Sequence, residues 1–498
     1  MDKVLTVLNV KNAENRYAKN IGSLFDLMQK AGKECADKIN SVLPVKGKNV
    51  TVIVGEGNNG GDGFIAASRL LSLGASVTVV ALGQPKTESA KAAALDYDGK
   101  VIAYTQGVFD TADILVDAVY GIGFHGQLKS EIVEIFDSFN KSKAFKVSID
   151  IPSGLCADSG EENPSSIKAD LTIALICYKP CHLLFPAAEH CGKTVLCDLD
   201  FPDELFLKDE ILGEIIPQPV FTKRLRNTHK GSYGKSFAVT GSLGMAGAAI
   251  LSLKATIKSG VGIAGIGLDK SIYSPVTSAV PEAVCTILDG DETAVVKPIE
   301  TADAVLIGCG LSKSEFASKL LKTTLETAKK TLIIDADGLN LLSDCIEWIK
   351  QTESALILTP HPTEMARLCG VTTTQIEADR IGYARDFAKK YNCVLVLKGA
   401  VTIVASPKGE IYFNLTGNAG MATGGSGDML SGIILSLSAQ GYSPIEAAKT
   451  AVYIHGAAGD IAAKKVGEIS LMVSDMIDVL PDLFIKFGEK DICENLRH

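Results

Sequence analysis

Short apolar runs, each followed by a glycine-rich or polar turn, recur along the whole chain and constrain its fold more than any other feature. The first group has an apolar run at residues 50–54, a Gly/Asn-rich loop, an amphipathic stretch at 64–73 and an apolar run at 77–82. This order predicts a strand, a helix and a parallel strand. Fully apolar short runs are typical of a parallel sheet buried on both faces. Further runs lie at 114–116, 146–149, 171–176 and 194–197.

The second half repeats this α/β rhythm after a proline-punctuated stretch at residues 215–220. We therefore expect two α/β domains, at 1–213 and 223–498, joined by a linker at 214–222. A helical pattern covers residues 375–390 between two of the strands. The apolar runs of this half lie at 236–239, 261–268, 304–307, 331–334, 355–358 and 394–397.

Composition narrows the class of protein. The 498 residues are too many for one ordinary domain, and 46% hydrophobic and 21% charged residues are typical of a globular protein. The net charge of -9 argues against a nucleic acid or an anionic membrane as the main partner. The 12 cysteines lack C-x-x-C spacing, which favours reduced thiols, and no stretch approaches the length of a membrane span. We expect a cytoplasmic protein.

The first glycine-rich loop reads GEGNNGGDG at residues 55–63. It follows a predicted strand and opens a predicted helix, where backbone N–H groups and the helix dipole can hold a phosphate group. The plainer alternative is a tight strand-to-helix turn. However, the Asn-Asn-Gly-Gly-Asp segment adds amide and carboxylate oxygens that such a turn does not need.

Two further segments follow strands of the first domain, DAVYGIGFHG at residues 117–126 and DIPSG at 150–154. The carboxyl ends of strands share one crevice in a doubly wound sheet, so distant residues can converge there. Oxygen atoms of such side chains suit a hard cation. The residues expected to converge are Asn59, Asp117, Asp150 and Ser153.

These three motifs together resemble the N-terminal domain of bifunctional NAD(P)H-hydrate repair enzymes, which is an NAD(P)H-hydrate epimerase with a Rossmann-like three-layer fold. The resemblance implies that Asp150 is the catalytic acid/base and contacts the substrate. It also implies a potassium ion held by Asn59, Asp117 and Ser153. The other residues implied in binding the hydrate are Asn58, Asn59, Gly60, Gly61 and Asp62, together with Gly121, Ile122, Gly123, Phe124, His125, Gly126 and Gln127.

The second glycine-rich loop ends in Gly425-Ser426-Gly427-Asp428 and precedes an apolar helix. Successive backbone N–H groups at a helix N-terminus stabilise charge on a phosphoryl group in transfer, and a carboxylate beside them can accept a proton from the attacking hydroxyl. A glycine-rich helix cap is the alternative. The large number of glycines in residues 414–428 favours a site.

Other strand ends of the second half also carry polar or small residues, at 241–248, 309–310, 335–337, 359–364 and 398–402. All of them should lie on the ligand side of the sheet. A single histidine is more often structural, but the prolines on both sides of His361 fix its loop and favour a role in the site.

The segments HKGSYGK, TPHPTEMARL and GNAGMATGGSGDML resemble the ADP- or ATP-dependent NAD(P)H-hydrate dehydratases, a family with a ribokinase-like fold, over residues 223–498. The resemblance implies Asp428 as the catalytic base and magnesium bound with ADP or ATP. It implies that Ala248, Gly310, His361 and Asp428 contact the hydrate. The residues implied in nucleotide binding are Lys398, Gly399, Ala400, Val401, Thr402 and Gly427.

The two resemblances together imply a repair enzyme that interconverts the R and S forms of NAD(P)H hydrate and dehydrates the S form through a phosphorylated intermediate. A homo-oligomer is also expected. Two alternatives stay open. The second half could be a small-molecule kinase, since fold alone does not fix function, and the first half could be a binding domain without catalysis.

Overall fold

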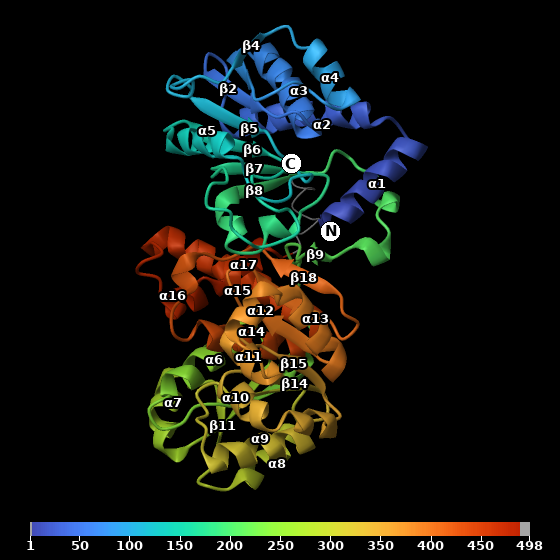
Figure 1. Ribbon diagram of the computed structural model, residues 1–498. Helices are drawn as coiled ribbons and strands as arrows, with labels where there is room; N and C mark the ends of the chain where they lie inside the picture. The colour runs from blue at the N-terminus through green and yellow to red at the C-terminus, as the bar shows by residue number, and fades with distance from the viewer. Residues whose placement is uncertain (1, 489–498) are drawn as a thin grey trace. The chain divides into compact units, whose positions relative to one another are not determined.

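The computed structural model describes residues 2–488, which separate into two compact units. The first is Asp2–Glu214 and the second begins at Ile215. In Figure 1 the first unit runs from blue to green and the second from green to red. No helix among the described residues is both long and apolar enough to cross a membrane.

The sheet of the first unit is parallel throughout, in the order β4-β3-β2-β5-β6-β7-β8. The order reverses between β2 and β5, which is where ligands bind in a doubly wound sheet. A short antiparallel pair, β1 with β9, lies apart from it. The strands are β1 (Lys3–Val4), β2 (Asn49–Val54), β3 (Ser76–Ala81), β4 (Lys100–Ala103), β5 (Ile114–Ala118), β6 (Phe145–Ile149), β7 (Leu171–Leu175), β8 (Lys193–Cys197) and β9 (Gly213–Ile215).

Alternate side chains of each strand enter different cores, which gives this unit three layers. Val52 packs with α2 and α3, whereas its neighbour Ile53 packs with Phe136 and Phe139 of α5. The fully apolar strands predicted from the sequence are thus covered on both faces. The helices of this unit are α1 (Val7–Asn20), α2 (Leu24–Val42), α3 (Asn58–Ser72), α4 (Glu88–Leu95) and α5 (Ser130–Lys141).

The sheet of the second unit runs β18-β17-β16-β15-β14-β13-β10-β11-β12. It is parallel from β12 to β16 and ends in the antiparallel strands β17 and β18. The α/β class predicted for both halves is confirmed. The strands are β10 (Lys235–Val239), β11 (Ile263–Leu268), β12 (Val284–Ile287), β13 (Ala304–Ile307), β14 (Thr331–Ile334), β15 (Ala355–Leu358), β16 (Val394–Leu397), β17 (Thr402–Ala405) and β18 (Ile411–Asn414).

One face of this sheet is covered by α6, α14 and α15, whose apolar residues share a core with the strands. α14 is buried along most of its length, as the apolar sequence after Asp428 predicts. The helices are α6 (Ala246–Lys258), α7 (Tyr273–Ala279), α8 (Val296–Glu300), α9 (Glu315–Thr327), α10 (Asp337–Asp344), α11 (Pro362–Cys369), α12 (Thr373–Ala378), α13 (Arg380–Tyr391), α14 (Ser426–Ala439), α15 (Pro444–Val466), α16 (Val473–Asp478) and α17 (Leu480–Lys486).

The single helix predicted at residues 375–390 is wrong. The structure has α12 and α13 there, separated by Asp379. The Asp379 side chain accepts a hydrogen bond from the Gly382 backbone at 2.8 Å and caps α13. The carboxylate competes with continued helix for the backbone N–H groups, so a new helix begins at Arg380.

Candidate functional site

The first unit contains a cavity of about 860 Å³ at the carboxyl ends of its central strands. Most residues predicted to bind substrate line it, which confirms that they lie together although they are distant in sequence. These are Asn58, Asn59, Asp62, Gly121, Ile122, Gly123, Phe124, His125, Gln127 and Asp150.

Three predicted glycines do not line this cavity. A Cβ atom at Gly60 would lie 2.1 Å from the Gly55 carbonyl oxygen, and one at Gly61 would lie 2.5 Å from the Met28 sulfur. These two glycines therefore permit close packing of α3 rather than facing the cavity. Gly126 lines a separate cavity of about 480 Å³.

Asp150 follows β6 directly and has a left-handed backbone with φ of 66°, an uncommon conformation for aspartate. Its Oδ1 atom accepts a hydrogen bond from Lys179 Nζ at 2.5 Å, and both side chains are almost fully buried. Lys179 Nζ also donates to the Leu175 carbonyl at 2.7 Å. Burial lowers the pKa of Lys179, but the charge of Asp150 more than offsets this and raises it overall. The site therefore holds a buried ion pair.

His182 fixes the backbone of both partners. Its Nδ1 atom accepts a hydrogen bond from the Lys179 backbone at 3.0 Å, so its Nε2 atom donates to the Asp150 carbonyl at 2.8 Å. Burial lowers the pKa of His182 to about 4, and the Lys179 charge adds to this effect. The imidazole is thus neutral near pH 7 and acts as a positioning group.

Asp117 lies at the end of β5 and is fully buried. Its carboxylate accepts hydrogen bonds from Ser153 Oγ at 2.5 Å and from Ser148 Oγ and the Ser153 backbone at 2.8 Å. Burial raises the pKa of Asp117 in spite of these bonds. Asn59 is also buried, and its Nδ2 atom has no hydrogen-bond partner among the described residues.

Two further carboxyl groups line the same cavity, Glu14 of α1 and Asp62 of α3. Burial raises the pKa of Glu14 to about 7, although Lys179 lowers it. Burial and then the charges of Asp150 and Glu14 raise the pKa of Asp62 well above its ordinary value. The cavity therefore combines an ion-paired carboxylate with carboxyl groups that favour the protonated form.

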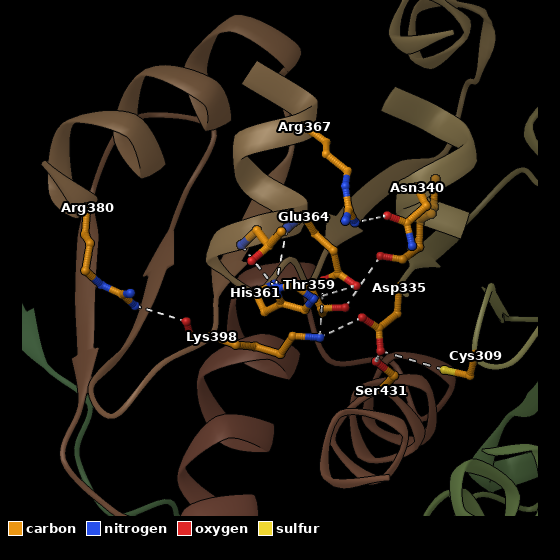
Figure 2. A network of polar contacts seen from close by, with 12 residues as sticks. Cys309, Asp335, Asn340, Thr359, His361, Glu364, Arg367, Arg380, Lys398 and Ser431 are labelled. Carbon is orange, nitrogen blue, oxygen red and sulfur yellow. Dashed lines mark hydrogen bonds and ion pairs between the residues drawn. The ribbon is translucent and has the colours of Figure 1, made fainter. Parts of the chain in front are cut away.

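In the second unit, Lys398 and Asp335 form the centre of a polar network at the ends of β16 and β14 (Figure 2). Lys398 Nζ lies 2.8 Å from Asp335 Oδ1 and 3.8 Å from Glu364 Oε2. Ser431 Oγ donates to Asp335 Oδ2 at 2.8 Å. Burial raises the pKa of Asp335, but Lys398 more than compensates and lowers it overall.

His361 caps the N-terminus of α11, where its Nδ1 atom accepts a hydrogen bond from the Thr363 backbone at 3.1 Å. Its own backbone N–H donates to Glu364 Oε2 at 2.8 Å. Burial lowers the pKa of His361, and burial raises the pKa of Glu364 to about 7. The Nε2 atom of His361 lies 3.4 Å from Glu364 Oε1, and the His361 side chain is half exposed.

Asp428 occupies the first turn of α14. Gly425 precedes the helix in a left-handed conformation with φ of 92°, and no side chain caps the helix. The first N–H groups of α14 are therefore available to an anion. Burial and then the charge of Asp335 raise the pKa of Asp428 to about 6.

The other predicted contacts of the second unit lie beside this turn. A Cβ atom at Gly427 would lie 3.3 Å from Lys398 Nζ, and one at Gly310 would lie 2.8 Å from the Ala248 side chain. Ligand atoms of Cys309, Asp335 and Asp428 lie within 4.8 Å of one another. The structure thus brings the predicted residues of several strand ends into one site.

The predicted nucleotide-binding segment, Lys398 to Thr402, forms the turn between β16 and β17. Arg380 Nη2 donates to the carbonyls of Lys398 at 3.1 Å and of Leu397 at 3.3 Å (Figure 2). A third bond at 3.4 Å reaches the Val401 carbonyl. The guanidinium therefore fixes the shape of this turn.

Both halves of the chain match known families. Residues 24–181 match the family described as YjeF-related protein N-terminus, and residues 237–482 match the family described as NAD(P)H-hydrate dehydratase. The bifunctional NAD(P)H-hydrate repair enzyme Nnr of Moorella thermoacetica is 33% identical over 91% of this chain and 91% of its own length. The Escherichia coli enzyme of the same name is 33% identical over 95% and 92%. The chain belongs to the bifunctional NAD(P)H-hydrate repair enzymes.

Among solved structures, the ADP/ATP-dependent NAD(P)H-hydrate dehydratase of Bacillus subtilis, co-crystallised with ATP/Mg2+, is 32% identical. The alignment covers 54% of this chain and 95% of that one, with a TM-score of 0.49. The curated relatives confirm the family predicted from the sequence, and the two largely parallel sheets confirm the α/β fold class. Of the activities that the sequence left open for the second half, the family favours the dehydratase over a small-molecule kinase.

Sequence reasoning about this family member missed three charged residues at its sites: Glu14, Lys179 and Arg380. Lys179 and Arg380 are buried, which is rare for such side chains without a partner. The available signal for Lys179 was its place shortly after a fully apolar strand, next to Pro180. Glu14 gave no local signal, since α1 precedes the glycine-rich loop by many residues.

Proposed function

We propose that this repair enzyme uses the Asp150 cavity to interconvert the two epimers of NAD(P)H hydrate and the Asp428 site to dehydrate the S epimer with ADP or ATP. The observation that carries the proposal is the contrast between these aspartates. Asp150 is ion-paired with Lys179 on the wall of the first cavity, whereas Asp428 lies in the first turn of α14, which no side chain caps.

The Asp428 site fits phosphoryl transfer to a hydroxyl group. Hydroxide leaves poorly at neutral pH, so the hydroxyl group on the reduced nicotinamide ring must first become a phosphate ester. Asp428 takes the hydroxyl proton, and the oxygen attacks the terminal phosphorus of the nucleotide. The ring nitrogen's lone pair then expels phosphate, and loss of a proton from the neighbouring carbon restores the reduced nicotinamide.

The nucleotide's phosphates fit the turn of α14 and the Lys398 ammonium, which supply N–H groups and positive charge. Magnesium bound to the nucleotide would neutralise phosphate charge during transfer. The carboxylates of Asp335 and Asp428 lie close together and would repel a phosphate group that has no metal ion. They therefore fit a nucleotide with bound magnesium better than a nucleotide alone. His361, Ala248 and Gly310 would contact the hydrate, and the turn at Lys398 to Thr402 the nucleotide.

The Asp150 cavity fits proton transfer to and from the oxygen atom that the ring carbon carries. The Asp150 carboxylate, which is paired with the Lys179 ammonium, would accept a proton from water. A potassium ion would be held by Asn59, Asp117 and Ser153. These groups fit because each carries a side-chain oxygen, the kind of ligand that a hard cation takes. The ion would supply positive charge behind the cavity.

The test uses separated R and S epimers of NADH hydrate with ADP or ATP, followed by the return of NADH absorbance. The native chain should recover NADH from both epimers. The Asp150→Asn variant should recover it from the S epimer at the native rate but from the R epimer only at the uncatalysed rate. Recovery from the R epimer at the native rate in that variant would contradict the role of Asp150. Build-up of a stable phosphorylated metabolite would instead favour a kinase.

The domain limits proposed for these activities are 1–213 and 223–498, with the linker at 214–222. They are supported by the two compact units and by the separate family matches. A cytoplasmic location and a homo-oligomer also stay predictions, and light scattering of the purified chain tests the oligomer.

A further inference from the structure

Glu14 is a carboxyl group of the first cavity that the reaction described above does not use. It lies on α1 and lines the same cavity as Asp150 and Lys179. It makes no hydrogen bond or ion pair with residues 2–488, and it is only partly exposed, on the cavity wall. An unpaired carboxyl group that faces a substrate cavity is a candidate for proton transfer.

The two carboxyl groups differ in their partners. Lys179 Nζ donates hydrogen bonds to Asp150 Oδ1 at 2.5 Å and to the Leu175 carbonyl. These two bonds fix the ammonium group beside Asp150. The charge of Lys179 lowers the pKa of Glu14, but no ion pair joins the two side chains in the described structure. Burial has the larger effect and raises the pKa of Glu14 to about 7. A pair of carboxyl groups whose environments differ in this way divides into one acid and one base.

We propose that Glu14 is a second catalytic residue of the epimerase, which donates a proton to the departing hydroxyl group while Asp150 accepts a proton from the incoming water. This inference rests on the proposed function of the Asp150 cavity. It adds a group of opposite role, which an epimerisation through loss and return of water requires.

The atoms balance as follows. The C–O bond breaks, its electron pair goes to oxygen, and the Glu14 proton completes a water molecule. The ring nitrogen's lone pair forms a C=N bond, which leaves a cationic ring. Water then attacks the opposite face of the same carbon, and Asp150 takes its proton. One proton has moved from Glu14 to Asp150, and its return through Lys179 or solvent resets the site.

The charged and titratable groups that interact with Glu14 lie on α1, on α3 and in the segments that follow β6 and β7. Lys11 lies on the same helix and lowers the pKa of Glu14, as Lys179 does, whereas Asp150 raises it. Asp62 of α3 interacts with Glu14 and favours its own protonated form. The epimerase rate should therefore fall as pH rises above about 7, because the acid form of Glu14 is lost.

The experiment compares Glu14→Gln with Glu134→Gln in the full chain. Glu134 of α5 is an exposed carboxylate outside the cavity lining, so it is a matched control. Epimerisation is measured from the R epimer between pH 5.5 and pH 9, values chosen to bracket about 7, and dehydration is measured from the S epimer. Glu14→Gln should lose about 100-fold in epimerisation and lose the fall at high pH. Glu134→Gln should keep the native rate and profile.

Each other outcome has a distinct meaning. A Glu14→Gln variant that is slower but keeps the native pH profile has only lost active protein, which overturns the proposal. A native rate in Glu14→Gln overturns it as well. If Asp150→Asn is also fully active, the function of the whole cavity is wrong, whereas an inactive Asp150→Asn beside an active Glu14→Gln rejects Glu14 alone.

Discussion

The two units place their lysine differently with respect to the aspartate that carries the chemistry. In the first unit, Lys179 pairs directly with Asp150, the proposed acid/base. In the second, Lys398 pairs with Asp335, and Asp428 is left with a pKa raised to about 6. The same pair of residue types at strand ends therefore yields a charge-stabilised carboxylate in one site and a more basic one in the other.

The difference fits the two reactions. A cavity that must handle a cationic ring needs negative charge beside the ring, and the Asp150 carboxylate that pairs with Lys179 fits this need. Phosphoryl transfer needs positive charge near the phosphates and a base near the hydroxyl, so Lys398 and Asp428 are better kept apart. Asp335 keeps them apart because its Oδ1 atom accepts a hydrogen bond from Lys398. Its Oδ2 atom is contacted by Ser431 and Cys309.

The largest effect is expected for Asp428→Asn. Without the base, dehydration of the S epimer should fall by about 1,000-fold, which is within the usual contribution of general base catalysis. The shape of the site is retained because asparagine has nearly the same volume. Epimerisation, measured as exchange between R and S forms without nucleotide, should keep the native rate. A loss of both activities would show that the two units are not independent.

A smaller and more selective effect is expected when each lysine is replaced. Lys179→Met leaves Asp150 buried without its cation, so epimerisation should fall by about 100-fold with dehydration unchanged. Lys398→Met is the matched variant and should impair only dehydration. Rates on separated epimers measure both. Equal loss of both activities in either variant would contradict the separate roles of the two ion pairs.

The sequence predicted the loops that line these candidate sites where a single strand end carries the signal. The loops after β2, β5 and β6, and the turn before α14, were found because glycine and polar residues directly follow apolar runs. The ion pairs could not be predicted, because Lys179 and Asp150 are brought together only by the pairing of β6 with β7. Arg380 was hidden in a pattern that predicted one continuous helix, where Asp379 in fact begins a new one.

The pH dependence of the two activities should differ in direction. Asp428 acts as a base, so dehydration should be constant above its pKa of about 6 and fall about tenfold per pH unit below it. Epimerisation should instead decline on the alkaline side, where Glu14 loses its proton. Measuring kcat/KM for each epimer across pH tests this. An acid limb that persists in the residual activity of Asp428→Asn would show that another group causes it.

The smallest effect is expected for Ser431, whose hydroxyl group donates a hydrogen bond to Asp335. Ser431→Ala removes a buried hydrogen bond to a charged carboxylate and should lower the unfolding free energy of the second unit by about 2 kcal/mol. Ser438→Ala is the matched control on the same helix, since the Ser438 hydroxyl is buried without a partner among the described residues. It should be neutral or slightly stabilising. Urea unfolding followed at Trp348 separates the two variants, and equal destabilisation would mean that Ser431 contributes by packing alone.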